Sequence, residues 1–530
     1  MNILHLYENM ELGGAETHIL TLAKEFSQNN HKVFIGSPNG PAIELFHRNN
    51  IIHLNIDNFY DIKSTIEKVY SFCIENEIDI IHCHYFCSQL VGVIIGSVLN
   101  IPVVTTVHGV YNNENIGIFQ DYFSGIIFVS EEACEKHISQ IRTNNYEKAK
   151  IIHNSVEVKS NNIKKPDSLT DEKLNILYIS RLDNDKFPSI NFIIDALFKL
   201  APKINWRLKI LGSGNRFNDI VGKSAKVNNE LAEERIQVLG AKKNVSQYII
   251  SSDVVIGVGR VILEGIQWKK PVICIGNSNY VGLIDKSKLN KISQVNFTDR
   301  NSVENLDVSS LQKDLHKIVR SDPELLKTIE QNYKEVLNKY SSNVSYSKHL
   351  EVYNNAKRLN KPTQFHNLMN DLQKSSLIGG YFKDLVYASN LDYPIYHEKQ
   401  EKILMIPNFS DPLDTWKENL EQFLNSQRLL ENFSLTIKIP NHLLYKSDSI
   451  IKDIEDVLFK YQANSRIADI VVDIYNLTSE GEVALINKHN VFIHTNRQQI
   501  FLMIQCKLLE ISVINNIELM NRQLPEQVEN

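Results

Sequence analysis

The segment HCHYFC, which begins at His82, places two imidazoles and two thiols within six residues, and these are donor types that zinc prefers. The isoleucine-rich run at 78–81 just before it is typical of a buried strand, so the histidines fall at the strand's C-terminal end. Successive side chains of a strand face opposite ways, so His82 and His84 share a face while Cys83 points away. Cys87 lies beyond the following turn. This pattern favours polar strand-end residues beside a cleft over a metal site.

Two further segments carry residues suited to a phosphorylated ligand. In LGGAETHI, Gly13 and Gly14 would let the backbone approach a ligand closely, and the next helix would present free N–H groups to an anion. A plain tight turn explains this glycine pair equally well. In SRLDNDKFP, Arg181 and Lys186 lie on one loop and together suit a diphosphate. Each of these charges could instead be a solvated surface group.

A third segment, DVVIGVGRVILEGIQWKKPVICIG, suits a nucleotide. Gly257 and Gly259 end a predicted strand, and the helix that follows carries Glu264 one turn in. Such a helix start can hold a phosphate, and a carboxylate can accept hydrogen bonds from the two hydroxyls of a ribose. The alternative for Glu264 is an acid on the helix surface, although its apolar neighbours favour partial burial.

Apolar runs of strand length alternate with stretches of helical period, which predicts parallel sheets covered on both faces. A polar stretch at 158–173 interrupts the alternation and is typical of a linker. Strands are expected at 2–7, 32–36, 51–56, 78–84, 102–108, 125–129 and 150–153, and the alternation resumes after the linker. The predicted division is a domain at 1–157, the linker, a second domain at 174–359, a connecting segment at 360–394 and a third domain at 395–530.

Composition limits the class of protein. A chain of 530 residues is too long for a single hydrophobic core and suggests about three domains at roughly 150 residues each. A net charge of −5 gives no case for nucleic-acid binding, and six scattered cysteines favour a reduced, cytoplasmic setting over a disulfide framework. The N-terminus lacks the pattern of a secretory signal, and the apolar stretch at 90–107 predicts a buried helix, a turn and a strand rather than a transmembrane segment.

Nine ordered motifs within residues 1–355 together resemble the retaining glycosyltransferases of family 4, which have the GT-B fold of two facing Rossmann-like domains. These motifs are GGAETHILTLAKEF, IIHCHY, IPVVTTVHG, IIFVSE, KIIHNSVE, ILYISRLDNDK, LKILGSG, IQVLG and GVGRVILEGIQWKKPVI.

The resemblance implies roles for particular residues. Gly14 would approach the donor phosphates, Arg181 and Lys186 would neutralise the diphosphate, and Glu264 would hold the ribose. His108 would contact the transferring sugar near the reaction centre. The family needs no metal and no cofactor. Residues expected around these groups are Gly13, Gly257, Gly259 and Arg260 on the donor side, and His82 and His84 on the acceptor side.

One departure from the family concerns sugar recognition. The family usually has two glutamates separated by seven residues, and the first of them commonly touches the donor sugar. Ile256 occupies that place here, so a sugar hydroxyl would lose a carboxylate acceptor. A donor handled differently, or a subfamily that uses Gly257 to Arg260 instead, would both fit.

The last third repeats the pattern of the second domain. The apolar positions of KILMIPNFSDPLDTWKENLEQFL, from Lys402, run in step with those that begin at Asn175, and NVFIHTNRQQIFLMIQ matches the segment from Asp253, with Arg497 over Arg260. The functional positions differ. Asn408, Leu413 and Phe501 stand where the second domain has Arg181, Lys186 and Glu264. We therefore expect a scaffold or interaction module, and generic α/β similarity without shared ancestry remains an alternative.

The sequence as a whole predicts transfer of a sugar from a nucleotide-diphosphate donor to a saccharide or lipid-linked acceptor, in cell-surface polysaccharide or glycolipid synthesis. The expected setting is the cytoplasm, with peripheral contact at the inner face of the membrane, no transmembrane segment and no nucleic-acid partner. Two other hypotheses stay open: a catalytically inactive relative that acts as a binding or partner subunit, and a sugar-nucleotide epimerase.

Overall fold

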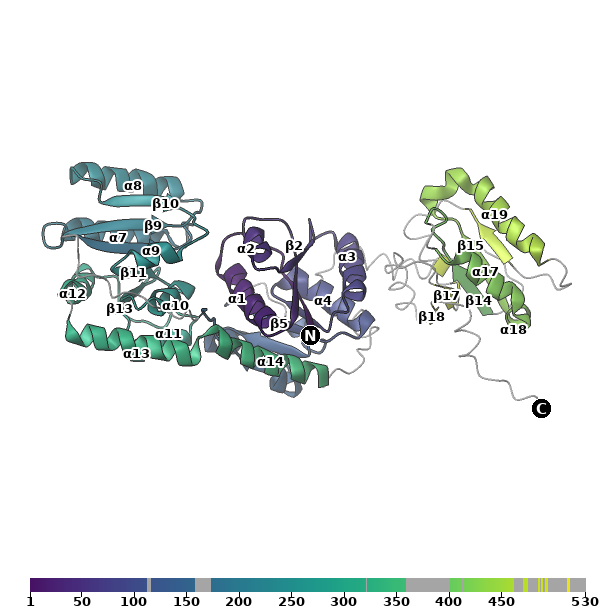
Figure 1. The fold of residues 1–530 in the computed structure, drawn as a ribbon, viewed down its shortest axis with the longest axis horizontal. Coiled ribbons are helices and arrows are strands. Elements are labelled where there is room, and N and C mark those ends of the chain that lie inside the picture. Colours follow the sequence, from purple (N-terminus) through teal and green to yellow (C-terminus); the bar gives the residue numbers. More distant parts are fainter. Residues whose placement is uncertain are drawn as a thin grey trace. The chain divides into compact units, whose positions relative to one another are not determined.

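The computed structural model contains three predominantly parallel sheets, around which we define the first, second and third domains (Figure 1). The chain forms two compact units: one includes the first two sheets and the other includes the third. The structure describes residues 1–111, 116–157, 173–320, 322–358, 401–411, 414–461, 470–474, 485–486, 488–489, 491–493 and 512–514.

The first domain is a seven-stranded parallel sheet in the order β3-β2-β1-β4-β5-β6-β7. Every strand expected from the β-branched runs is present, with ends that differ from the prediction by one or two residues. The strands are β1 (Asn2–Leu6), β2 (Lys32–Ser37), β3 (Ile52–Asn55), β4 (Ile80–Cys83), β5 (Val103–Val107), β6 (Gly125–Phe128) and β7 (Ala149–Ile151).

Helices connect these strands, as a parallel sheet requires. They are α1 (Gly14–Gln28), α2 (Ile43–His47), α3 (Ile62–Glu75), α4 (Phe86–Leu99), α5 (Ile116–Phe119), α6 (Glu131–Ile138) and the 3₁₀ helix η1 (Thr143–Lys148). A helix from much later in the chain, α14 (Ser342–Arg358), packs against α1, β5 and β6, and its Tyr353 is wholly buried in the first domain's core. The first domain therefore depends on a segment that comes after the second domain.

The second domain has a six-stranded sheet in the order β10-β9-β8-β11-β12-β13, in which only β13 is antiparallel. Both faces are covered, because alternate residues of one strand enter different cores: Ile176 and Tyr178 of β8 lie in one cluster and Leu177 lies in the other. The strands are β8 (Leu174–Ile179), β9 (Trp206–Leu211), β10 (Ile236–Gly240), β11 (Val254–Gly257), β12 (Val272–Ile275) and β13 (Tyr280–Leu283).

The helices of the second domain alternate with its strands. They are α7 (Phe187–Leu200), α8 (Phe217–Glu230), α9 (Ser246–Ile250), α10 (Arg260–Gln267), α11 (Lys286–Ser293), α12 (Val308–Val319) and α13 (Pro323–Lys339). Aspartate side chains cap three of them at the N-terminus, which satisfies N–H groups that have no partner within the helix.

The third domain has five parallel strands in the order β16-β15-β14-β17-β18. The strands are β14 (Glu401–Met405), β15 (Phe433–Lys438), β16 (Ile470–Asp473), β17 (Val491–Ile493) and β18 (Ser512–Ile514). The helices are α17 (Trp416–Asn425), α18 (Gln427–Asn432), the 3₁₀ helix η2 (Asn441–Lys446) and α19 (Ser447–Lys460). The linker expected at 158–173, apart from Lys173, and the connecting segment at 360–394 lie outside the described residues.

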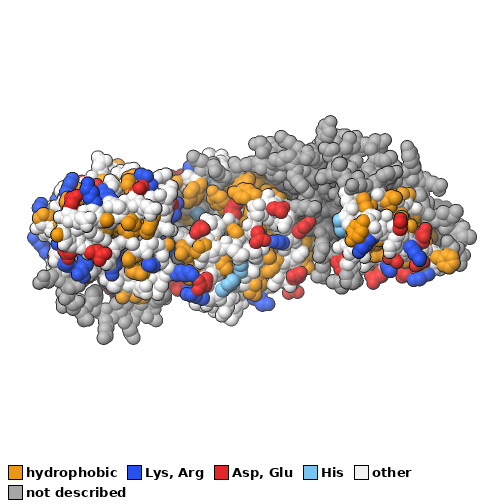
Figure 2. Space-filling model, turned by 90° about the horizontal axis from the view of Figure 1, so that it is seen from above, with side chains coloured by type: hydrophobic (Ala, Val, Ile, Leu, Met, Phe, Trp, Pro, Cys, Tyr) orange, Lys and Arg blue, Asp and Glu red, His pale blue; other side chains and the backbone are white. Residues whose placement is uncertain are grey.

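Two surface properties bear on the partners expected from the sequence. On the face shown in Figure 2, basic and acidic side chains are interspersed over the parts of the chain that the structure describes. Among those same parts, no helix combines the length and the apolar character that crossing a bilayer would require.

Candidate active site

The start of the first helix, α1, comes directly after the first predicted glycine turn. Gly13 precedes the helix in extended conformation, and a Cβ there would lie 2.6 Å from Glu16 Oε2. At Gly14 no atom lies within 4 Å of the Cβ position, so the space beside it is open. The turn therefore leaves room for a ligand beside Gly14, and the Glu16 side chain lies against Gly13.

Glu16 is a residue that the sequence analysis missed. It is 5% exposed. Burial raises its pKa to about 7, an effect opposed by a hydrogen bond from its own backbone N–H and by the charge of Arg181. Arg181 therefore lies close enough to the first turn of α1 to act on it electrostatically. The GGAE motif contains this glutamate, but nothing in the motif indicates that it is buried.

The loop after β8 carries the two predicted phosphate ligands. Arg181 is well exposed and binds Asp183 at 2.9 Å and Asp185 at 3.4 Å. Lys186 lies 3.5 Å from Asp185 and forms the N-cap of α7. Two cations on the loop that leads into a helix suit a diphosphate. The diphosphate would share Arg181 with Asp183 and Asp185.

The glycine turn after β9 supports that loop. Gly212 and Gly214 have positive φ, and a Cβ on Gly212 would overlap the carbonyl oxygen of Ser180. The backbone of Leu182 hydrogen-bonds to Ser213 at 2.8 Å. The glycines of the LGSG motif therefore allow this turn to pack tightly against the loop that carries Arg181 and Lys186.

The third predicted segment begins α10, but its glycines are partly engaged within the protein. Gly259 has φ +66°, and its N–H donates to the carbonyl of Phe297 at 2.6 Å, so it is not free for a phosphate. A Cβ on Gly257 would lie 2.7 Å from Val261 Cγ1. Ile256 is wholly buried in the core of the second domain, so no side chain replaces the family's first glutamate in the cleft from this position.

Arg260 joins the two domains. Its guanidinium donates to the carbonyl of Ser155, to Thr21 Oγ1 at 3.0 Å and to Glu264 Oε1 at 3.2 Å. Glu264 keeps a side-chain exposure of 24%, whereas Arg260 keeps 11%. The predicted ribose ligand therefore remains accessible, while the predicted donor ligand Arg260 is committed to contacts between α10 and the first domain.

The predicted histidines lie together at the strand ends of the first sheet. His84 Nδ1 lies 3.0 Å from His108 Nε2, and the His82 and His84 rings stack with centroids 4.3 Å apart, as expected for residues on one face of β4. His108 is partly exposed. His82 and His84 are wholly buried, and their place on the acceptor side stays a prediction.

His82 is held on both sides of its ring by core groups. Its Nδ1 lies 2.6 Å from Tyr353 Oη, and its Nε2 lies 2.8 Å from Thr106 Oγ1. The HCHYFC motif therefore packs α14 onto the first sheet, which no sequence pattern near position 82 could indicate.

Three more buried histidines belong to this cluster, and the sequence analysis missed them. They are His5, His18 and His349, which come from β1, α1 and α14. His18 lies edge-on to His108 with ring centroids 5.2 Å apart. Burial lowers the pKa of His108 to about 4 and that of His5 to about 3, so both imidazoles are neutral at ordinary pH.

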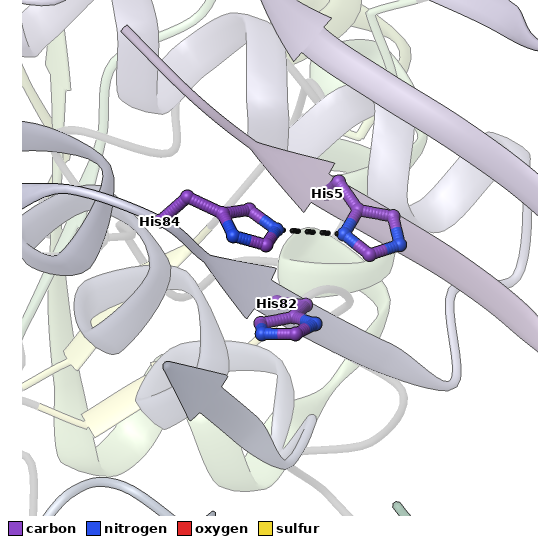
Figure 3. A group of neighbouring side chains, drawn as sticks. All are labelled: His5, His82 and His84. Atoms are coloured by element: carbon purple, nitrogen blue, oxygen red, sulfur yellow. Dashed lines mark hydrogen bonds between the residues drawn. The ribbon is translucent and has the colours of Figure 1, made fainter. Parts of the chain in front are cut away.

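Three of these imidazoles could in principle hold a metal ion. Ligand atoms of His5, His82 and His84 all lie within 4.8 Å of one another. Figure 3 shows these rings at the ends of β1 and β4, with a hydrogen bond between His5 and His84 and none from either to His82. The predicted pair of thiols takes no part: Cys83 lies beside Gly92 of α4, and the pKa of Cys87 is raised to about 12 by burial.

In the third domain, the strand β14 leads to Asn408. Its side chain accepts a hydrogen bond from the backbone of Ser410 at 3.3 Å, and its own N–H donates to Asp414 at 2.7 Å. Leu413, Arg497 and Phe501, the other positions compared with the second domain, lie outside the described residues.

Comparison with known proteins agrees with the resemblance drawn from the motifs. Residues 12–160 match the model of the family described as Glycosyltransferase Family 4. An uncharacterised glycosyltransferase of Methanocaldococcus jannaschii is 24% identical over 160 residues, which is 26% of this chain and 40% of that protein. The chain thus aligns with less than half the length of this curated relative.

Two solved structures show the fold. A glycosyltransferase from Rickettsia africae is 21% identical, and the match covers 68% of this chain and 99% of that chain with a TM-score of 0.54. Anabaena HepE, in complex with UDP and glucose, is 18% identical. The match covers 66% of this chain and 99% of that chain, with a TM-score of 0.51. The predictions of a GT-B fold and of an additional Rossmann-like domain are confirmed.

Proposed function

We propose that this chain is a retaining glycosyltransferase that moves a hexosyl group from a nucleoside-diphosphate donor to an acceptor hydroxyl. The observation that carries the proposal is that one helix, α1, contacts residues from two of the predicted segments. His18 lies edge-on to His108, and Thr21 accepts a hydrogen bond from Arg260. The charge of Arg181 also lowers the pKa of Glu16 in the same helix.

The charges at this place suit a diphosphate that leaves during the reaction. As the bond between the anomeric carbon and the phosphate oxygen breaks, negative charge grows on the diphosphate, and Arg181 and Lys186 would stabilise it. The N-terminus of α7, at which Lys186 lies, adds to this effect. Glu264 would accept hydrogen bonds from the ribose hydroxyls. UDP and UDP-glucose complexes are known for Anabaena HepE, so UDP-sugars are the first donors to test.

The acceptor would supply the attacking oxygen on the face that the diphosphate leaves. The acceptor oxygen forms the new bond to the anomeric carbon, and its proton passes to the departing phosphate, which gives retention without a protein base. This scheme agrees with the cluster's histidines, whose lowered pKa values make them weak bases. We propose a saccharide or lipid-linked acceptor in polysaccharide or glycolipid synthesis, and a reaction that needs no metal.

The test is a screen of nucleotide sugars with the full-length protein, which measures both binding and release of the nucleoside diphosphate. We expect at least one UDP-sugar to bind and to be turned over slowly by water or rapidly with an added acceptor, and NMR of the product to show retention. Binding without any turnover across donors and acceptors would instead support a non-catalytic binding subunit. Inversion in the product would refute the retaining mechanism.

A further inference from the structure

Three histidines form a continuous hydrogen-bonded chain that ends at the predicted reaction centre. His5 Nδ1 lies 2.8 Å from His84 Nε2, and His84 Nδ1 lies 3.0 Å from His108 Nε2. His5 and His84 are wholly buried, whereas His108 is partly exposed. These hydrogen bonds therefore run from the core of the first domain to a partly exposed residue.

A neutral imidazole has one N–H and one bare nitrogen, so His84 can donate only one of its two hydrogen bonds and must accept the other. Burial lowers the pKa of His84 far below its ordinary value, which keeps the ring neutral. All hydrogen bonds among the three histidines must therefore be donated in the same direction, and that direction fixes the tautomer of each histidine.

The buried end of the chain decides the direction. His5 Nε2 has no hydrogen-bond partner among the described residues. If His108 donated to His84 and His84 donated to His5, the proton of His5 would lie on this buried Nε2 without an acceptor. A buried N–H donor left without a partner is costly, and unpaired acceptors are tolerated better than unpaired N–H groups. The opposite direction leaves only a bare nitrogen at this end.

We propose that His5 and His84 are positioning residues that hold the proton of His108 on Nδ1. His5 donates to His84, His84 donates to His108 Nε2, and His108 is left with an Nδ1–H group that has no partner among the described residues. His108 then acts as a hydrogen-bond donor to an oxygen of its ligand. That this oxygen belongs to a donor sugar rests on the proposed function; the tautomer itself does not.

A metal ion at His5, His82 and His84 is the competing interpretation of the same cluster. It fits less well, because both nitrogens of His82 already bind Tyr353 and Thr106, and both nitrogens of His84 already bind other histidines. A metal at this place would have to replace several of these hydrogen bonds within a wholly buried core. Hydrogen bonding accounts for both nitrogens of His82 and His84 without an ion.

The direct test is ¹⁵N NMR of the full-length protein labelled at histidine, with His108 assigned by the resonance lost in His108→Gln. We expect the ligand-free wild-type protein to show His108 with its proton on Nδ1. A proton on Nε2, or a mixture of the two tautomers, would overturn the proposal. This measurement needs no substrate, so it can fail while glycosyl transfer is found, or succeed while no donor is turned over.

A matched pair of variants separates tautomer control from packing. His84→Phe breaks the chain, so the tautomer of His108 should change and kcat should fall about 10- to 100-fold, the range seen for partners that orient a functional histidine. His82→Phe also removes two buried hydrogen bonds, but it should leave the tautomer of His108 unchanged. Equal tautomers in both variants, or one stoichiometric metal ion lost on either substitution, would contradict the proposal.

Discussion

The second and third domains share one strand order around their first strand, and they differ in the loops that leave the strand ends. The order is β10-β9-β8-β11-β12 in the second domain and β16-β15-β14-β17-β18 in the third, so β14 corresponds to β8. The loop after β8 carries Arg181 and Lys186, whereas β14 leads to Asn408. The expected repeat of architecture therefore holds for the sheet, although a Rossmann-like order alone does not distinguish shared ancestry from generic similarity.

The turn that follows the second strand of each sheet, β9 or β15, also differs between the two domains. After β9, Gly212 and Gly214 adopt conformations that allow close packing against the Arg181 loop. After β15, the chain continues as Ile439 and Pro440, which is a stiffer turn without glycine.

Two buried polar side chains among the described residues of the third domain have partners within that domain. Thr436 lies 2.7 Å from His489 Nε2, and the buried Lys438 donates to the carbonyl of Ile439 at 2.8 Å. In the second domain, by contrast, Arg181 is well exposed. Among the described residues, the third domain thus keeps the strand order of the second, while Asn408 stands where the second domain has Arg181.

The largest effect should come from the cations of the second domain. Arg181→Ala and Lys186→Ala should each lower kcat by about 10²-fold or more, because each removes a charge that stabilises the leaving diphosphate. Asn408→Ala is the matched change in the third domain and should alter kcat by less than about twofold. Steady-state kinetics with the best donor from the screen measures all three, and near-normal rates in both second-domain variants would remove the donor-site assignment.

Substitution of Glu264 should have a smaller effect, which is a loss of affinity for the nucleotide. Calorimetry of the full-length protein with UDP should show one site, and Glu264→Gln should weaken it by about tenfold, since an amide replaces one of two acceptor oxygens for the ribose. The triple variant Arg181→Ala, Lys186→Ala, Glu264→Gln should show no site. Residual binding in that variant would locate a second nucleotide site elsewhere in the chain and break the contrast between the two domains.

The sequence was sufficient to predict the strands of the sheets, because β-branched runs such as the one at 78–81 are bounded by turn residues. This local pattern decides where strands form. It was sufficient for the loop of Arg181 and Lys186 because the loop comes directly after a strand. It could not reveal the histidine cluster, since His5, His84 and His349 are far apart in sequence. The pairing of β1 with β4 brings His5 and His84 together, and the packing of α14 on the first sheet adds His349.

The turn that supports the Arg181 loop provides a contrast within the second domain. Gly212→Ala should lower the melting temperature and destabilise the protein by about 1–3 kcal/mol, because the new Cβ would overlap the carbonyl of Ser180. Gly222→Ala, at an open position within α8, should instead stabilise by roughly 0.5–1 kcal/mol. Thermal unfolding of the two variants measures this difference, and UDP affinity should fall in Gly212→Ala alone. Equal shifts would mean that the glycine turn does not hold the loop.

The smallest effect should come from removal of metal. Among the described residues, the only group of three suitable metal ligands is His5, His82 and His84 in the first domain. The described residues of the second and third domains contain no such group. Because Arg181 and Lys186 can neutralise the diphosphate without an ion, a strong chelator should change kcat by less than about twofold and leave the melting temperature unchanged. Elemental analysis before and after treatment is the control for removal. Activity lost with a stoichiometric metal, and restored when that metal is returned, would show that the charge of the leaving group is handled by an ion rather than by the loop that distinguishes the second domain from the third.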